Sequence, residues 1–116
     1  MKRIHTILII LMLCAYSEAH SIKIVTTSKT NSRVEYAVEY IKKKLSALGY
    51  TFPNHGNDYK ISLKIASDTT GLKKEGFRIT SAKKRIFIEG YDGSGVIYGC
   101  NELAEYAALH HDINIG

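Results

Sequence analysis

An apolar stripe at helical spacing between residues 32 and 48 constrains this chain more than any other feature of its sequence. Ser32 and Glu35 have the spacing of a capping box, and Gly49 stands where a helix commonly ends in a left-handed residue. We therefore predict an amphipathic helix over 32–48, whose apolar side must be covered by a sheet or another helix. The stripe consists of Val34, Ala37, Val38, Ile41, Leu45 and Leu48.

Four segments predict the strands of a sheet that could cover this stripe. Residues 22–26 are short and β-branched, and residues 59–66 alternate between apolar and polar, which is typical of a strand with one buried face. Residues 75–80 and 85–89 are joined by the turn 81–84 and predict an antiparallel hairpin.

A second helix is predicted over residues 94–108, with Asp92 or Ser94 as its cap. The element order is then β-α-β-β-β-α. This order favours an α+β, two-layer domain in which one mixed sheet carries both helices on one face. The inner stripe of the second helix would contain Ile97, Cys100, Leu103 or Ala104, and Ala107.

Residues 1–19 have the features of a cleavable secretory signal peptide. A positive start precedes an apolar run, and Ser17 and Ala19 put small residues at the positions that a signal peptidase reads. The apolar run is shorter than the ~20 residues that span a bilayer, so we expect a secreted or periplasmic product and no membrane span. Cys14 leaves a lipoprotein as a minor alternative, although the preceding Leu13 is larger than that processing prefers.

Cleavage after Ala19 would leave residues 20–116, which suffice for one domain. Only Cys100 would remain, so no intramolecular disulfide could form. The chain carries a net charge of +5, but its basic residues are spread out and no aromatic residues interleave with them as a base-stacking platform requires. We therefore expect a solvated basic surface and no nucleic-acid partner.

Glycines between the last predicted strand and the second helix raise the question of a nucleotide cofactor. Gly93, Gly95 and Gly99 lie where glycines can cradle phosphate, but their spacing is one residue longer than the dinucleotide fingerprint. No later strand brings an acidic residue to a ribose. Close packing of the helix on the sheet explains the same glycines, so we expect no cofactor. A nucleotide-binding enzyme ranks third among our functional hypotheses, because it rests on these glycines alone.

The candidates for metal binding or nucleophilic catalysis do not form a recognisable set. His110, His111 and Asp112 lack a third ligand at helical spacing, and His55 stands in a loop. Cys100 falls on the predicted inner face of the second helix, where a thiol acts as a small apolar filler. We predict no metal site and no nucleophile.

Glycoside cleavage would need two carboxyl groups facing each other across a cleft. Glu102 and Glu105 are three residues apart on a helix, which is typical of a solvated face. One sheet with two helices on one side offers no such cleft, so we predict no catalytic residue in this chain. The only carboxylate candidates are Glu89, Asp92, Glu102 and Glu105.

Residues 75–103 carry short motifs in a recognisable order. They include Glu75-Gly76-Phe77-Arg78-Ile79, Ile86-Phe87-Ile88-Glu89-Gly90 and Gly95-Val96-Ile97-Tyr98-Gly99. This series resembles the accessory N-terminal domain that precedes the barrel in family 20 β-N-acetylhexosaminidases. Related domains precede the barrels of family 67 α-glucuronidases and family 84 enzymes. The resemblance covers about residues 21–108, and the structural motif that it marks is Gly76, Asp92, Gly95, Tyr98 and Gly99.

The resemblance implies a non-catalytic domain over residues 20–108 that packs against a (β/α)8 barrel, in which the catalytic carboxylates lie. Residues 109–116 would be a tail or the start of a linker. We therefore expect a fragment of a secreted glycoside hydrolase that acts in carbohydrate degradation, whose partner is the missing barrel or another protein surface. A stand-alone secreted module that binds carbohydrate or a protein is the alternative.

A surplus of apolar side chains also predicts an interface. Two helices are expected to leave some of them uncovered, and uncovered apolar surface on a small domain usually marks a contact. The candidates are Tyr91, Tyr98 and Tyr106, together with Phe77, Ile79 and Phe87 on the second face of the sheet.

Overall fold

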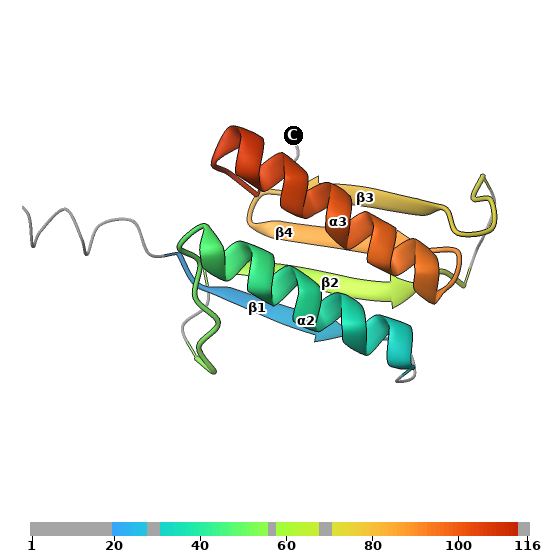
Figure 1. Cartoon of the computed structure of the whole chain (residues 1–116), viewed down its shortest axis with the longest axis horizontal. Helices are drawn as coiled ribbons and strands as arrows, with labels where there is room; N and C mark the ends of the chain where they lie inside the picture. Colours follow the sequence, from blue (N-terminus) through green and yellow to red (C-terminus); the bar gives the residue numbers. More distant parts are fainter. Residues whose placement is uncertain (1–19, 28–30, 56–57, 68–70, 114–116) are drawn as a thin grey trace, which may run out of the picture.

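The computed structural model describes residues 20–27, 31–55, 58–67 and 71–113, and the predicted signal peptide over residues 1–19 lies outside them. A four-stranded sheet lies behind two helices that run side by side over one of its faces (Figure 1). The predicted α+β two-layer class and the element order are therefore confirmed. The elements are β1 (Ile22–Thr26), α2 (Ser32–Ala47), β2 (Tyr59–Ile65), β3 (Phe77–Ala82), β4 (Arg85–Gly90) and α3 (Gly93–His110).

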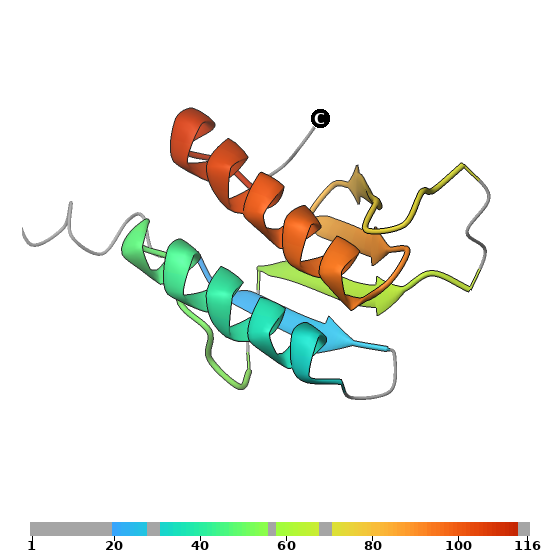
Figure 2. The same ribbon diagram turned by 45° about the vertical axis from the view of Figure 1, so that its right-hand side comes forward.

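The sheet is mixed, with the strand order β1-β2-β4-β3. β1, β2 and β4 are parallel, and β3 pairs antiparallel with β4 at the edge of the sheet (Figure 2). The predicted hairpin is thus present, although β3 continues to Ala82 and leaves only Lys83 and Lys84 between the strands. Parallel pairing of β1 with β2 requires a crossover, which α2 provides.

The hydrophobic core lies between the sheet and the helices. Ile61 and Leu63 of β2 and Ile86 and Ile88 of β4 are completely buried. Because alternate residues of a strand point to opposite faces, these four side chains share the helix-covered face. The helices close the core with Val34, Ala37, Ile41 and Leu45 from α2 and Val96, Cys100, Leu103, Ala104 and Ala107 from α3, and Ile113 completes it.

Several positions differ from the predicted apolar stripes, and Val38 of α2 is one of them because it is only partly buried. Leu48 is 40% exposed because it is the C-cap of α2 and follows the helical residues. Ile97 is only half-buried, and the neighbouring Val96 is the completely buried residue of that turn. Ile113 is completely buried beyond the end of α3.

The start of α2 differs from the prediction by one residue. Asn31, not Ser32, is the N-cap, because its side-chain Oδ1 accepts a hydrogen bond of 2.9 Å from the backbone N–H of Val34. Ser32 is already the first helical residue, and asparagine is as good a cap as serine. At the other end, Gly49 has a φ of 97°, so the left-handed residue predicted after the helix is confirmed.

The register of the strands corrects the predicted second face of the sheet. Phe77 pairs with Gly90 and Ile79 pairs with Ile88, so both side chains lie on the helix-covered face, and not on the second face. Of the three candidates, only Phe87 lies on the uncovered face. The prediction was wrong because the sequence does not show which alternating set of β3 residues lies on the same face as the buried residues of β4. We call this uncovered side of the sheet the open face.

Among the residues that the structure describes, neither helix has the length and apolar character needed to cross a bilayer.

Candidate functional site

The junction between β4 and α3 contains the predicted structural motif, and Asp92 organises it. Asp92 is the N-cap of α3, and its Oδ1 accepts a hydrogen bond of 2.9 Å from the backbone N–H of Gly95. Its Oδ2 accepts a longer hydrogen bond of 3.3 Å from the backbone N–H of Glu75. One carboxylate therefore caps α3 and also attaches the loop before β3 to it.

The glycines of the motif allow backbones to approach closely. A Cβ atom on Gly95 would overlap the carbonyl oxygen of Gly76, and one on Gly99 would lie 2.5 Å from the Cγ2 atom of Ile88. Side-chain carbons do not tolerate such contacts, so only glycine fits at both positions. The carbonyl of Gly76 also accepts a hydrogen bond of 2.9 Å from the N–H of Tyr91. These contacts hold the first turns of α3 directly against the sheet.

This geometry favours packing over phosphate binding at the glycines. The amino end of a helix can attract an anion, but here the Asp92 carboxylate already occupies that position. The carbonyl of Gly76 fills the space beside Gly95 that an incoming phosphate would need. Tyr98, the aromatic member of the motif, is 49% exposed.

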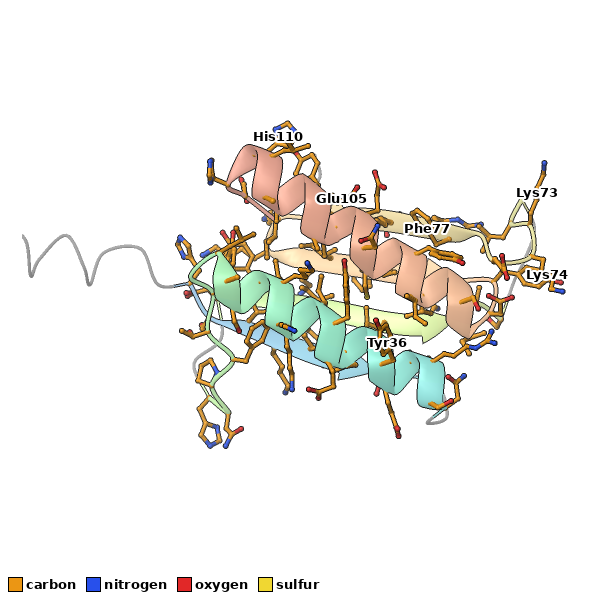
Figure 3. The ribbon with its side chains drawn as sticks, viewed as in Figure 1. Tyr36, Lys73, Lys74, Phe77, Glu105 and His110 are labelled. Carbon is orange, nitrogen blue, oxygen red and sulfur yellow. The ribbon has the colours of Figure 1, made fainter. Side chains whose placement is uncertain are left out.

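The structure does not bring the candidate carboxylates into an opposed pair. Glu89 lies on the open face of the sheet, because it alternates with the buried Ile88. Glu102 and Glu105 lie on the exposed side of α3, where Figure 3 labels Glu105. Glu105 accepts a hydrogen bond of 3.4 Å from the Asn101 side chain. Asp92 is engaged as the cap of α3. Of the other three carboxylates, Glu89 lies on the open face of the sheet and Glu102 and Glu105 lie on α3, so the sheet separates Glu89 from the other two.

The histidines and the cysteine are also dispersed. His110 packs against Tyr106 with ring centroids 4.2 Å apart, and His111 is the left-handed C-cap of α3. His55 is exposed in its loop. Burial raises the pKa of the Cys100 thiol to about 12, which keeps it protonated and unreactive at neutral pH. The described residues hold no group of three or more metal-ligating side chains.

A depression of about 440 Å³ lies at the carboxyl ends of the two helices. No local pattern in the sequence predicts it, because its walls come from three distant parts of the chain. Nearby, burial and then the Asp112 carboxylate raise the pKa values of Tyr50 and Tyr59 above their usual range. The depression is lined by His20, Leu48, Gly49, Tyr50, Ala107 and His111.

Exposed aromatic side chains gather on the helices, on the side away from the sheet. Tyr36 of α2 is 59% exposed and stacks on Tyr40, with ring centroids 6.3 Å apart (Figure 3). The Tyr40 hydroxyl donates a hydrogen bond of 2.5 Å to Asn101 of α3, which joins the two helices. We call this region the helix-layer surface; it comprises Tyr36, Tyr40, Tyr98, Asn101, Glu105 and Leu109.

Basic residues gather on the open face, which the sequence alone did not predict. The sheet register places Lys23 of β1 beside Lys60 of β2, and Lys60 beside Arg85 of β4. We call these three residues the cation row. They appear scattered in the sequence because β2 and β4 are neighbours in the sheet but not in the chain.

Comparisons with known proteins agree with this architecture. Residues 15–112 match the family model described as glycosyl hydrolase family 20, domain 2. The chain is similar to a GH138 enzyme targeting pectin rhamnogalacturonan II, with 30% identity and a TM-score of 0.72 over 83% of this chain and 14% of that one. No curated protein matches it.

A second solved structure is similar in fold. It is a β-N-acetylhexosaminidase from Bacteroides fragilis NCTC 9343, with 23% identity and a TM-score of 0.52 over 75% of this chain. This chain spans 16% of that enzyme, so in both comparisons the likeness is confined to one domain of a much larger protein.

Proposed function

This chain belongs to the family of glycosyl hydrolase family 20, domain 2, and on that premise we propose that it is the non-catalytic accessory domain of an exported glycoside hydrolase. The observation that carries the proposal is the family match, which covers nearly all the described residues. In this role the domain packs against a catalytic (β/α)8 barrel outside these 116 residues and holds it in a fixed orientation.

The helix-layer surface is the side that would contact the barrel. It exposes Tyr36, Tyr98 and Leu109, whereas the open face exposes only Phe87 among the described large apolar side chains. Interfaces are enriched in aromatic residues. Tyr36 and Tyr98 offer the aromatic surface that such a contact buries, although Lys43 and Lys44 lie beside Tyr36. The open face carries the cation row and fewer exposed aromatic side chains.

The substrate class that we propose for the parent enzyme is carbohydrate polymers in general. The two similar enzymes are described by different activities, and this chain corresponds to a small part of each. Since the catalytic groups would lie in the barrel, the sugar and the linkage are properties of that barrel. Both hexosaminidase-like and α-glucuronidase-like parents fit the accessory role.

The coding DNA downstream of Gly116 tests the accessory role. We expect a reading frame, intact or interrupted by a single stop or frameshift, that encodes a barrel with a pair of catalytic carboxylates. An unrelated downstream region would contradict the proposal and favour the stand-alone binding module.

Activity measurements test the absence of catalysis in this chain. The purified full-length chain should not release chromophore from chromogenic β-N-acetylhexosaminides or α-glucuronides above the rate of buffer alone. Turnover that is lost when Glu102 and Glu105 are replaced by glutamine would show that the chain is itself an enzyme.

Export is a further part of the proposal and rests on the signal-like residues 1–19. Expression of the full chain in a secreting host should give a product whose first residue is His20. Amino-terminal sequencing or intact mass measurement checks this outcome. A cytoplasmic product that retains Met1, or a lipid-modified Cys14, would contradict cleavage after Ala19.

A further inference from the structure

Within the part of the chain that the structure describes, the open face carries no helix of the kind that usually covers parallel strands. Strands β1, β2 and β4 are parallel, and sheets of parallel strands are typically covered by helices on both faces. Both described helices lie on one face, which is turned toward the reader in Figure 1. The far face carries the exposed side chains of Lys23, Lys60 and Arg85.

The cation row places like charges on adjacent strands. Neighbouring strands are about 4.8 Å apart, and like charges directly opposite each other destabilise a sheet. Toward the other end of the same face, Lys64, Glu89 and Arg78 are also register neighbours, but there the charges alternate. In that second arrangement the Glu89 carboxylate stands between the two cations, whereas the cation row has three positive charges in line and no carboxylate between them.

The turn after β3 adds another cation in a strained conformation. Lys83 has a φ of 56°, in the left-handed region that hairpin turns normally assign to glycine, asparagine or aspartate. Lys84 follows it and lies beside Arg85. Strained residues persist where the surrounding structure requires them and often mark functional positions. Only Lys83 has this left-handed conformation, and its neighbour Lys84 contributes a further positive side chain beside the cation row.

The cations line a shallow depression of about 370 Å³. The one carboxylate among its lining residues is Asp58, and this group lies 3.9 Å from the His20 side chain and accepts a hydrogen bond of 3.4 Å from the N–H of Ser21. Four positive side chains therefore face one acidic side chain that has other partners. The lining residues are Lys23, Asp58, Tyr59, Lys60, Lys84 and Arg85.

The next positions along the strands suit a sugar ring. Phe87 follows Arg85 on the open face and is 38% exposed, and the register places Ser62 on one side of it and Thr80 on the other. An aromatic side chain can pack against the apolar face of a sugar, and hydroxyl groups can exchange hydrogen bonds with its hydroxyls.

We propose that the cation row, with Phe87, binds a polysaccharide rich in uronic acids, whose carboxylates meet Lys23, Lys60 and Arg85. A polymer with a carboxylate on successive residues supplies the repeated negative charge that three aligned cations require. The anionic character of the ligand rests on the charges alone, and its carbohydrate nature rests on the proposed function. The domain then holds an anionic glycan on the open face while its helix-layer surface remains available for the barrel.

A single-stranded nucleic acid also carries regular negative charge, but it is the less suitable partner. Proteins that bind single strands stack successive bases on several aromatic side chains. The open face offers Phe87 as its one exposed aromatic residue among the described strands. Single-stranded DNA therefore serves as the competing ligand against which binding of the polysaccharide is compared.

Binding of sodium polygalacturonate to the purified full-length chain tests the proposal. Affinity electrophoresis and titration calorimetry at low salt should show binding that weakens as salt is added. The triple variant Lys23→Ser/Lys60→Ser/Arg85→Ser should bind about tenfold more weakly, which is what the loss of three exposed ion pairs can produce. Circular dichroism confirms that the variant is folded.

The matched control removes the same charge from another surface. Lys42→Ser/Lys43→Ser/Lys44→Ser on α2 also removes three cations, and it should bind within about twofold of the unchanged chain. Equal losses in the two variants would show attraction by net charge alone and would overturn the assignment to the cation row. Phe87→Ser should weaken binding to polygalacturonate but not to polyglutamate, a polyanion that has no sugar rings.

Two comparison polymers define the ligand. Fully methyl-esterified polygalacturonate keeps the sugar but loses the charge, and it should not bind. Equal binding of this neutral polymer, or no binding of polygalacturonate at low salt, would overturn the proposal. Stronger binding of single-stranded DNA than of polygalacturonate through the same cation row would overturn the carbohydrate assignment.

These outcomes are independent of the test of the accessory role. A barrel encoded downstream together with no polyuronate binding would leave the proposed function intact and remove this inference. Specific polyuronate binding without an encoded barrel would support the cation row as a ligand site and remove the accessory role.

Discussion

The two faces of the sheet are built from alternating residues of the same strands, yet one is buried under helices and the other exposes charged side chains. On the covered face, Ile61 of β2 pairs with Ile86 of β4, and both side chains are completely buried under the helices. On the open face, the preceding register pair is Lys60 and Arg85, and both side chains are exposed. The comparison teaches that one face supplies the stability of the domain and leaves the other free to carry charge that does not help folding.

The largest effect that would test this comparison is a truncation on the covered face. Ile88→Ala removes a completely buried side chain that touches Gly99, so it should lower the free energy of unfolding by about 2–5 kcal/mol. Phe87→Ala, one residue earlier on the open face, should cost less than about 1 kcal/mol. Urea unfolding followed by circular dichroism measures both values. Equal costs would show that something buries the open face.

The second effect concerns the close approach of α3 to the sheet. Gly95→Ala forces a Cβ atom against the carbonyl of Gly76, which is backbone and cannot rotate away. We expect a loss of about 1–3 kcal/mol of stability, the usual cost of overpacking. Ser94→Ala, at the adjacent and partly exposed position, serves as the control and should cost much less. A stable Gly95→Ala variant would show that the junction relaxes and that the glycine is not required by packing.

Patterns within one element predicted the covered face well. The alternation over residues 59–66 and the stripe over residues 32–48 identify most of the residues that are buried, because burial on one face imposes a period on the sequence. The same periodicity could not settle whether Phe77 lies above or below the sheet, since that depends on the register of β3 with β4.

Features made from distant segments were not predictable from the sequence. The cation row requires the adjacency of β2 and β4, which are separated in the chain by β3. The depression at the carboxyl ends of the helices joins Tyr50 to Ala107. The capping-box spacing predicted Ser32 as the cap of α2, but the Asn31 side chain accepts the hydrogen bond from Val34 and caps the helix one residue earlier. Asp92 was one of the two caps predicted for α3, because its hydrogen bond to Gly95 spans only three residues. The contacts of Gly76 with Tyr91 and Gly95 join distant residues, and no local pattern predicts them.

The third effect is smaller and concerns the cap that joins the two ends of the motif. Asp92→Ala removes the acceptor for the N–H groups of Gly95 and Glu75, and it should cost about 1 kcal/mol. Asp92→Asn keeps an acceptor oxygen and should recover much of that loss. Thermal unfolding of the two variants in parallel measures the difference. Equal losses would indicate that the negative charge, and not the hydrogen bond, stabilises the start of α3.

The smallest effect has the opposite sign and applies to the open face. Lys60 stands between Lys23 and Arg85 in the register, so Lys60→Gln should raise the free energy of unfolding by a few tenths of a kcal/mol, roughly the value of a cross-strand charge pair. The gain should shrink at about 1 M salt, where the Debye length falls to ~3 Å. Lys43→Gln on the exposed side of α2 is the control. A loss of stability in Lys60→Gln that salt does not change would mean that the lysine stem packs on the sheet, and then the cation row would contribute to folding after all.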